Sequence, residues 1–165
     1  MRKRVIKVDI SAAGVNKAIQ ELKDWKEWLL RKTEQLLKEL ANEGVQIASA
    51  HFASAVYDGY SDVAVRMEER DENTVAVIGI GKTVLMLEFG SGVRYPDSHP
   101  EAGPENTIHG SWSEGEFGKG HWDNPKGWFY AHGKRSFGNP ANRCMYQTKS
   151  DLEARFEQIA RRVFV

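Results

Sequence analysis

The chain has 165 residues, and its 23 Lys and Arg residues are balanced by 23 Asp and Glu residues, which gives a formal net charge of zero. This length fits one soluble domain, residues 1–165, that can bury a core without disulfides or metal ions. The balanced charge excludes an overall field that would attract nucleic acid or an anionic membrane, and no apolar run is long enough to span a bilayer. We therefore expect no membrane partner and no sequence-specific nucleic acid partner.

The charges are segregated along the chain. Residues 1–60 carry ten basic and eight acidic side chains, residues 61–105 carry four and nine, and residues 106–165 carry nine and six. An acidic middle between basic ends suits head-to-tail contacts between copies of the chain. Charge of this kind is more often simply solvated surface, and we favour that interpretation on charge alone.

The single cysteine, Cys144, permits no disulfide within the chain and no cysteine zinc site, so a reducing compartment is expected. The basic N-terminus leads into residues 5–10, which are too few and too polar for the apolar core of a signal peptide. The protein is expected to stay in the cytoplasm that made it or to travel inside an assembly.

The first ten residues, 1–10, are predicted to contain a strand, because Ile6, Val8 and Ile10 alternate with Lys7 and Asp9. Such alternation is typical of a strand with one buried face.

From residue 15 the apolar positions change to helical spacing, which predicts an amphipathic helix over residues 15–56. Ser11 or Asn16 can cap its N-terminus. Gly44 interrupts the pattern, so a break into two helices there is a nearly equal alternative to one long helix. One helix of this length would reach about 60 Å, longer than a compact domain is wide, so part of it would lean on something else.

Residues 62–81 alternate on both sides of a polar loop and predict an antiparallel hairpin. The run Leu85–Phe89 then closes the sheet and places Glu88 among apolar residues, where a carboxylate must find a donor or a cation.

Residues 95–138 are rich in Pro, Gly, His and Trp and predict a long loop, or a loop with a small hairpin. Residues 145–164 predict a C-terminal helix. The fold class is therefore α+β, with a long N-terminal helix and a C-terminal helix packed on a small antiparallel sheet.

Four of the five histidines fall in the long loop, so a metal site can be imagined there. Its irregular spacing makes ordinary loop histidines the favoured interpretation. Cys144 follows Arg143, which could lower the pKa of the thiol, yet no catalytic context surrounds it. No cofactor and no enzymatic activity are expected. The imagined metal ligands are His109, His121 and His132 with Asp97, Glu101 or Asp123.

The loop tryptophans Trp112, Trp122 and Trp128 have two interpretations of equal weight. They could stack on sugars, bases or a partner's apolar pocket, or they could fold back into a small core beneath the loop. Stacking on bases is the weaker version, because no basic stripe accompanies the rings.

Two short motifs occur in a characteristic order. Glu88-Phe89-Gly90-Ser91 follows the hairpin, and Asn139-Pro140-Ala141 leads into the final helix. Together with the long charged N-terminal helix and the valine-rich hairpin, this order resembles the minor tail component, or tail-completion, family of long-tailed bacteriophages and prophages. In that family a Glu-Phe-Gly-Thr/Ser step follows the sheet and a Pro-Ala pair precedes the last helix. The long aromatic loop and residues 133–138 depart from the family's pattern.

The resemblance implies a structural virion protein that joins heads to tails or completes the tail at the phage neck. Such proteins work as a ring of copies, with connector and tail-tube proteins as partners, and have no known reaction to catalyse. Localisation would be the virion, and the bacterial host cytoplasm during assembly. In this setting Glu88 could pair with Arg94 or Arg143 of the same or a neighbouring copy. The interface and structural candidates are Glu88, Phe89, Gly90, Gly92, Arg94, Trp112, Trp122, Trp128, Pro140, Ala141 and Arg143.

An alternative function rests on the His- and Trp-rich loop alone. It is a metal-dependent or cell-wall-degrading enzyme, or a carbohydrate-binding module, that uses the loop as its site.

Overall fold

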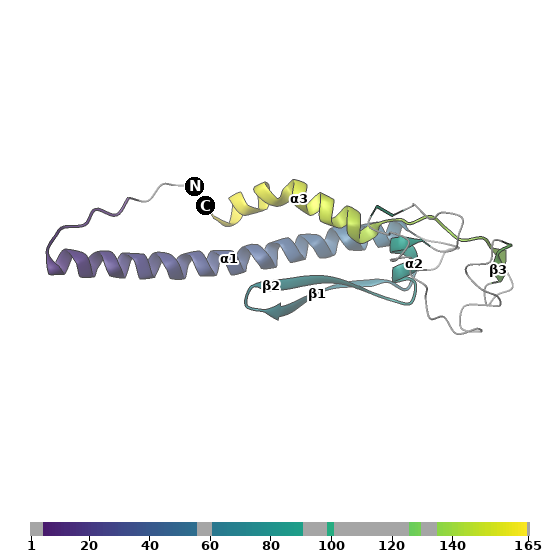
Figure 1. The fold of residues 1–165 in the computed structure, drawn as a ribbon, viewed down its shortest axis with the longest axis horizontal. Helices are drawn as coiled ribbons and strands as arrows, with labels where there is room; N and C mark the ends of the chain where they lie inside the picture. The colour runs from purple at the N-terminus through teal and green to yellow at the C-terminus, as the bar shows by residue number, and fades with distance from the viewer. Residues whose placement is uncertain (1–4, 56–60, 91–98, 101–125, 130–134, 165) are drawn as a thin grey trace.

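The structure, a computed structural model, describes residues 5–55, 61–90, 99–100, 126–129 and 135–164. It is an α+β fold, as predicted, in which a small antiparallel sheet lies along one side of a long helix and the C-terminal helix lies along the other (Figure 1). Within the described residues, none of the helices combines the length and apolar character that crossing a membrane requires.

The long helix α1 runs from Ala12 to Ser54 without a break. Ser11 caps it, because its hydroxyl oxygen accepts a hydrogen bond from the Gly14 N–H at 3.1 Å. Its 43 residues give a length of about 65 Å. The prediction of one long helix is therefore confirmed, and the alternative of a break at Gly44 is wrong.

Gly44 lies within the helix because the neighbouring elements pack into the space that a side chain would occupy. A Cβ atom built there would lie 3.0 Å from Val77 Cγ2 and 3.1 Å from Leu152 Cδ1. The glycine thus lets the sheet and the C-terminal helix approach α1 at the same point, which outweighs its low helix propensity.

The predicted hairpin consists of β1, Ala64–Asp71, and β2, Thr74–Ile80. The strands pair antiparallel with Met67 opposite Val77, and the register shifts between Glu69 and Asp71. The Asn73 N–H donates to Asp71 Oδ1 at 2.8 Å and stabilises the turn. The prediction of a hairpin over residues 62–81 is confirmed.

The predicted strand within residues 1–10 is wrong for the part that the structure describes. Residues 5–10 form no strand, and Val8 and Ile10 are 52% and 99% exposed. A strand needs a partner for its backbone hydrogen bonds. No described strand lies within reach of this segment, which precedes the free end of α1 (Figure 1).

The run predicted to close the sheet is a short helix instead. This helix, α2, spans Val84–Phe89 and follows β2 directly. Its place is set by Asp62, which accepts hydrogen bonds from the Lys82 and Thr83 N–H groups at 2.7 and 3.1 Å and from the Thr83 hydroxyl. These hydrogen bonds hold the turn between β2 and α2 at the end of the sheet.

The predicted long loop is described only in part. Two short strands, β3 at Trp128–Phe129 and β4 at Arg135–Ser136, pair antiparallel as a small hairpin would. Most of residues 95–138 lie outside the described residues, including Trp112 and Trp122.

The C-terminal helix α3 runs from Cys144 to Val163, one residue from the predicted bounds at each end. It packs along α1, where Trp28 meets Phe164 edge to face with ring centroids 6.0 Å apart. Polar pairs also join the two helices. His51 Nε2 lies 3.0 Å from Asp151 Oδ2, and Arg155 Nη1 lies 2.5 Å from Glu43 Oε1. The core sits at the other end of α3 and contains Phe52, Ala55, Leu87 and Cys144.

Candidate functional site

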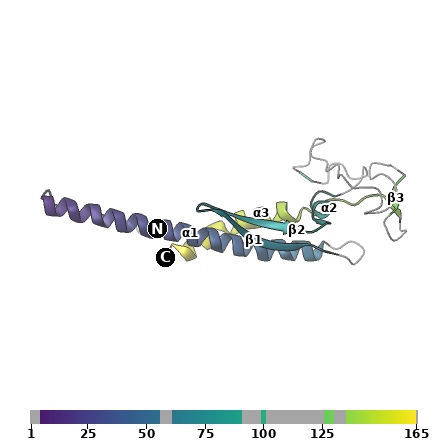
Figure 2. The same cartoon turned by 90° about the horizontal axis from the view of Figure 1, so that it is seen from below.

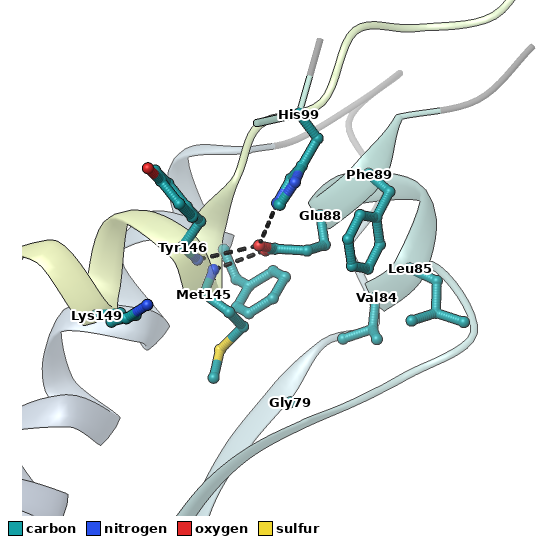
Figure 3. Close-up of a pocket in the computed structure, with 10 residues that line it drawn as sticks. Gly79, Val84, Leu85, Glu88, Phe89, His99, Met145, Tyr146 and Lys149 are labelled. Atoms are coloured by element: carbon teal, nitrogen blue, oxygen red, sulfur yellow. Dashed lines mark hydrogen bonds and ion pairs between the residues drawn. The ribbon is translucent and has the colours of Figure 1, made fainter. Parts of the chain in front are cut away.

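The candidate site is the corner where α2 meets the start of α3, and its central residue is Glu88. Although it is a carboxylate, Glu88 is only 6% exposed. Asp62 fixes α2 at the end of the sheet, and α2 then directs Glu88 toward the first turn of α3 (Figure 3).

Both oxygens of the Glu88 carboxylate accept hydrogen bonds. Oε2 accepts from the Met145 N–H at 2.6 Å, and Oε1 accepts from the Tyr146 N–H at 3.0 Å. These are N–H groups of the first turn of α3, which no residue four positions earlier can satisfy. Glu88 therefore caps a helix that begins 56 residues later in the chain.

The helix needs this distant cap because its own capping position cannot supply one. Arg143 occupies that position in a left-handed conformation, φ 57° and ψ 38°, without a side-chain capping bond. A carboxylate also interacts favourably with the positive end of the helix dipole. The Glu88 side chain thus couples the placement of α2 to the start of α3.

His99 completes the surroundings of the carboxylate. Its Nε2 lies 3.2 Å from Glu88 Oε1, a hydrogen bond that becomes an ion pair when the imidazole is protonated. The ring is 3% exposed and is held between Phe89 and Tyr146, with ring centroids 4.5 and 5.6 Å away. The segment that carries His99 is therefore anchored to the corner.

A second set of contacts ties α2 to the segment before α3. The Asn142 N–H donates to the Leu87 carbonyl at 2.8 Å, and the Arg143 N–H donates to the Glu88 carbonyl at 3.2 Å. Asn139 Nδ2 donates to the Met86 carbonyl at 3.2 Å. The last carbonyls of α2, which have no partner within the helix, are satisfied in this way.

Gly90 allows this close approach. Its φ is 78° and its ψ is −173°, a backbone conformation that only glycine adopts without strain. A Cβ atom there would lie 2.6 Å from the Asn139 carbonyl oxygen and 2.8 Å from the Ala141 nitrogen. The motif around Glu88 and the motif around Pro140 therefore lie directly against each other, about fifty residues apart in the sequence.

A cavity of about 300 Å³ adjoins the corner (Figure 3). Its lining is mainly apolar, and the Glu88 carboxylate points toward His99 and the first turn of α3, which line the cavity as well. The lining residues are Phe52, Gly79, Val84, Leu85, Glu88, Phe89, His99, Met145, Tyr146 and Lys149.

The contacts of the corner connect elements of the fold to one another. Both Glu88 oxygens are engaged by donors of the chain, which leaves the carboxylate poorly placed to act as a base. Burial, followed by the negative charge of Glu88, raises the pKa of the Cys144 thiol to about 11. The thiol is therefore protonated near neutral pH, opposite to the lowered pKa that Arg143 might have produced.

The structure brings six of the predicted site residues together: Glu88, Phe89, Gly90, Pro140, Ala141 and Arg143. Arg143 donates its backbone N–H to the Glu88 carbonyl, and His99 faces the Glu88 carboxylate. The predicted pair of Glu88 with Arg94 or Arg143, of the same or a neighbouring copy, stays a prediction. Gly92, Arg94, Trp112 and Trp122 lie outside the described residues, and Trp128 lies in β3 opposite Ser136.

The imagined metal ligands also lie outside the described residues: His109, His121, His132, Asp97, Glu101 and Asp123. Among the residues that are described, no three His, Cys, Asp or Glu side chains are placed to share a metal ion. The alternative function based on the loop therefore keeps its status as a prediction.

Sequence reasoning missed two residues of the corner, His99 and Asp62. His99 was one of several loop histidines, and its sequence neighbours give no sign that it reaches Glu88. Asp62 has a weak local signal, because it precedes a strand whose partner strand ends in the Gly81-Lys82-Thr83 turn. Only the hairpin pairing brings Asp62 to that turn.

We compared the chain with protein-family models, with curated proteins and with solved structures, and none of the three comparisons gave a match.

Proposed function

We propose that this chain is a structural virion protein that joins heads to tails, or completes the tail, at the neck of a long-tailed phage. In this proposal it acts as a ring of copies that contacts connector and tail-tube proteins. It would be made in the bacterial host cytoplasm and carried in the virion.

The observation that carries the proposal is the contact between the two resemblance motifs. The bare backbone of Gly90, in the first motif, packs against Asn139, Pro140 and Ala141 of the second. Beside this contact, the Asn142 and Arg143 N–H groups donate to the Leu87 and Glu88 carbonyls. A resemblance built on two unrelated short matches would not require them to meet. Their contact gives both motifs one physical purpose, which is to fix the start of the last helix against the end of the sheet.

The shape of the molecule supports an assembly role as well. All buried residues of α1 lie between Ala41 and Phe52, and the first part of the helix extends beyond both α3 and the hairpin (Figures 1 and 2). This extension exposes apolar side chains that a partner could cover. The exposed apolar residues on it are Val15, Ile19, Leu22 and Trp25.

Deletion of the gene from the phage or prophage that encodes the protein tests the proposal. After induction, electron microscopy should find filled heads and finished tails that are not joined, and plaque counts should fall. Supplying the wild-type gene from a plasmid should restore joined particles. Normal numbers of joined, infectious particles without the gene would overturn the proposal.

A pair of matched variants tests whether particle assembly depends on the α2 and α3 corner and not only on the presence of the protein. Replacing Glu88 with Gln in the complementing gene should reduce the yield of joined particles, because the α2 and α3 corner is weakened. Replacing the exposed Glu153 with Gln should leave the yield unchanged. Antibody labelling of intact particles should place the protein at the neck, and labelling confined to the tail tip would contradict a neck role.

A further inference from the structure

The segment ahead of α1, residues 5–10, has the pattern of a strand but no partner strand. Its apolar residues alternate with Lys7 and Asp9, yet Val8 and Ile10 are 52% and 99% exposed. We call residues 5–10 the arm. Contact with Gly14 fixes the direction of the arm. The Asp9 carbonyl oxygen packs on the bare backbone of Gly14, and a Cβ atom built on Gly14 would lie 2.4 Å from this oxygen. The arm leaves α1 through a tight turn and exposes apolar surface that ordinary folding would bury.

The hairpin, in turn, is a sheet with an edge to which another strand could be added. It is a two-stranded sheet, and within the described residues β1 pairs with β2 alone. Two strands are fewer than a stable sheet normally has, and an open edge is a template for a further strand. Gly44 faces Val77 of β2 and Leu152 of α3, so β2 is the strand nearer α3 and β1 forms the other edge (Figure 2).

The arm cannot reach the hairpin of its own chain. Lys38 marks the level of β1, because its Nζ lies 3.5 Å from Glu69 Oε1. Lys38 is 26 residues beyond Ala12, which is roughly 39 Å along the helix. Residues 5–11 span at most about 25 Å when fully extended. The strand that could complete this sheet must therefore come from another copy.

Charge and side-chain pattern favour the β1 edge and select a register. Arg66 and Glu68 lie on the outward face of β1, with side chains 63% and 43% exposed, and form an ion pair in which Arg66 Nη2 lies 3.5 Å from Glu68 Oε2. They alternate with the half-buried Val65 and Met67. β2 carries no charged side chain along its length. Only β1 therefore offers charges that can meet Lys7 and Asp9 of an added strand.

We infer that the arm of one copy adds as an antiparallel strand to the β1 edge of a second copy. Lys7 then lies opposite Glu68, and Asp9 lies opposite Arg66. In this register Val8 and Ile10 fall opposite Met67 and Val65, so the apolar face of the arm continues the face of the sheet that packs on α1. Only Ile6 of the apolar face then lies opposite a carboxylate, that of Glu69. A parallel strand with Lys7 opposite Glu68 would place both Val8 and Ile10 opposite carboxylates, those of Glu69 and Asp71, and is disfavoured.

Each copy has one arm and one open β1 edge, so the contact can repeat from copy to copy. A contact of this heterologous kind closes into a ring when the rotation between copies permits. The inference does not depend on a phage role. Self-association of the purified protein tests the arm contact alone, whereas deletion of the gene tests the proposed function alone.

Cross-linking tests the contact directly. A Lys7→Cys/Glu68→Cys variant treated with a short bismaleimide should form covalent multimers at high protein concentration. Cys144 is 1% exposed and does not compete for the reagent. The control Lys17→Cys/Glu68→Cys, which carries an exposed cysteine on α1 instead of the arm, should remain monomeric on a denaturing gel. Equal yields from the two variants, or no multimers at the highest soluble concentration, would overturn the inference.

A charge-reversal cycle tests the register. Lys7→Glu and Glu68→Lys should each weaken association by about two- to fivefold, as expected for an exposed ion pair. The double variant should recover affinity, and the control Lys17→Glu should have no effect. Sedimentation velocity over a concentration series measures all four. Removal of residues 1–10 should cost at least about tenfold, because the apolar face of the arm is lost. Association that survives this removal but is abolished by Leu22→Glu would place the contact on α1 and refute the arm.

Discussion

Glu88 shows how a carboxylate can be buried when both of its oxygens have hydrogen-bond partners. Its oxygens accept hydrogen bonds from two helix N–H groups, and His99 Nε2 lies 3.2 Å from Oε1. A buried charge with this many donors is stabilised, whereas the same charge without them would destabilise the fold. Removing the Glu88 carboxylate is therefore expected to lower the stability of the fold.

Replacing Glu88 with Gln should lower the free energy of unfolding by about 2 kcal/mol. The amide keeps one acceptor oxygen, but its NH₂ group would face a main-chain N–H that also needs an acceptor. Chemical denaturation followed by circular dichroism measures the change. Glu153→Gln, on the exposed face of α3, is the control and should change the value by less than about 0.5 kcal/mol. A stable Glu88→Gln protein would show that the cap is dispensable.

Asp62 gives the fold a pH dependence. Burial alone would raise the pKa of its carboxyl group, but hydrogen bonds from the Thr83 hydroxyl and from the Lys82 and Thr83 N–H groups outweigh burial and lower the pKa below 3.8. A carboxyl whose pKa is lowered by folding contributes stability that is complete above its unfolded pKa. That contribution is lost as the pH falls through the folded pKa.

Asp62→Asn should therefore destabilise the protein by roughly 1 kcal/mol at pH 7, because the amide still accepts part of these bonds. The difference from wild type should be constant above about pH 5 and shrink as the pH falls below 4. Urea denaturation of both proteins across this range measures it. A difference that does not vary with pH would mean that the charge of Asp62 contributes nothing.

At the scale of elements, the central contact is the packing of α1 against both the hairpin and α3. Its tightest point is Gly44, where Val77 and Leu152 approach from two sides. The pairs His51 with Asp151 and Glu43 with Arg155 lie on the same stretch of α1. Such partly exposed pairs add little energy, so close packing at Gly44 determines how well the elements fit together.

Gly44→Leu should destabilise the protein by about 1–2 kcal/mol. Leucine favours the helix over glycine by somewhat less than 1 kcal/mol, but its side chain overfills the contact with Val77 and Leu152. Thermal unfolding measures the effect. Ala50→Leu, at an exposed position of the same helix, should be neutral or slightly stabilising. Equal stability of the two variants would mean that α1 and its neighbours are loosely packed.

At the scale of the whole molecule, α1 has two different parts. The last third, from Ala41 onward, carries all of its buried residues, and the longer part before it has none. An isolated helix of this kind is held mainly by its own backbone hydrogen bonds, and few tertiary contacts protect it. The N-terminal part is therefore expected to be the least stable part of the helix.

Hydrogen exchange measured by mass spectrometry should show this gradient. Amides of residues 12–27 should exchange at least about tenfold faster than amides of residues 41–54 at a protein concentration that keeps the chain monomeric. Protection of residues 12–27 that appears only at high concentration would identify α1 as a contact between copies. Uniform protection along α1 in the monomer would contradict the two-part description.

The sequence by itself determined the elements that repeat a local pattern. The long helix, the hairpin and the C-terminal helix were predictable because their apolar spacing follows the helix or strand period. Glu88, Gly90 and Pro140 were also identifiable as special positions from composition and motif. The sequence could not show which residues face each other, because His99, Asn139 and Met145 reach the corner through contacts that follow no local period.

Only the tertiary structure decided the roles of these residues and of the arm. Capping turned Glu88 from a suspected salt-bridge residue into the link between α2 and α3, and the bare backbone of Gly90 made room for the segment before α3. The alternating pattern of residues 5–10 remained without a sheet, because a strand exists only with a partner edge and α1 carries this segment away from its own. Local patterns specify what a segment can form, and the contacts available in space decide whether it forms.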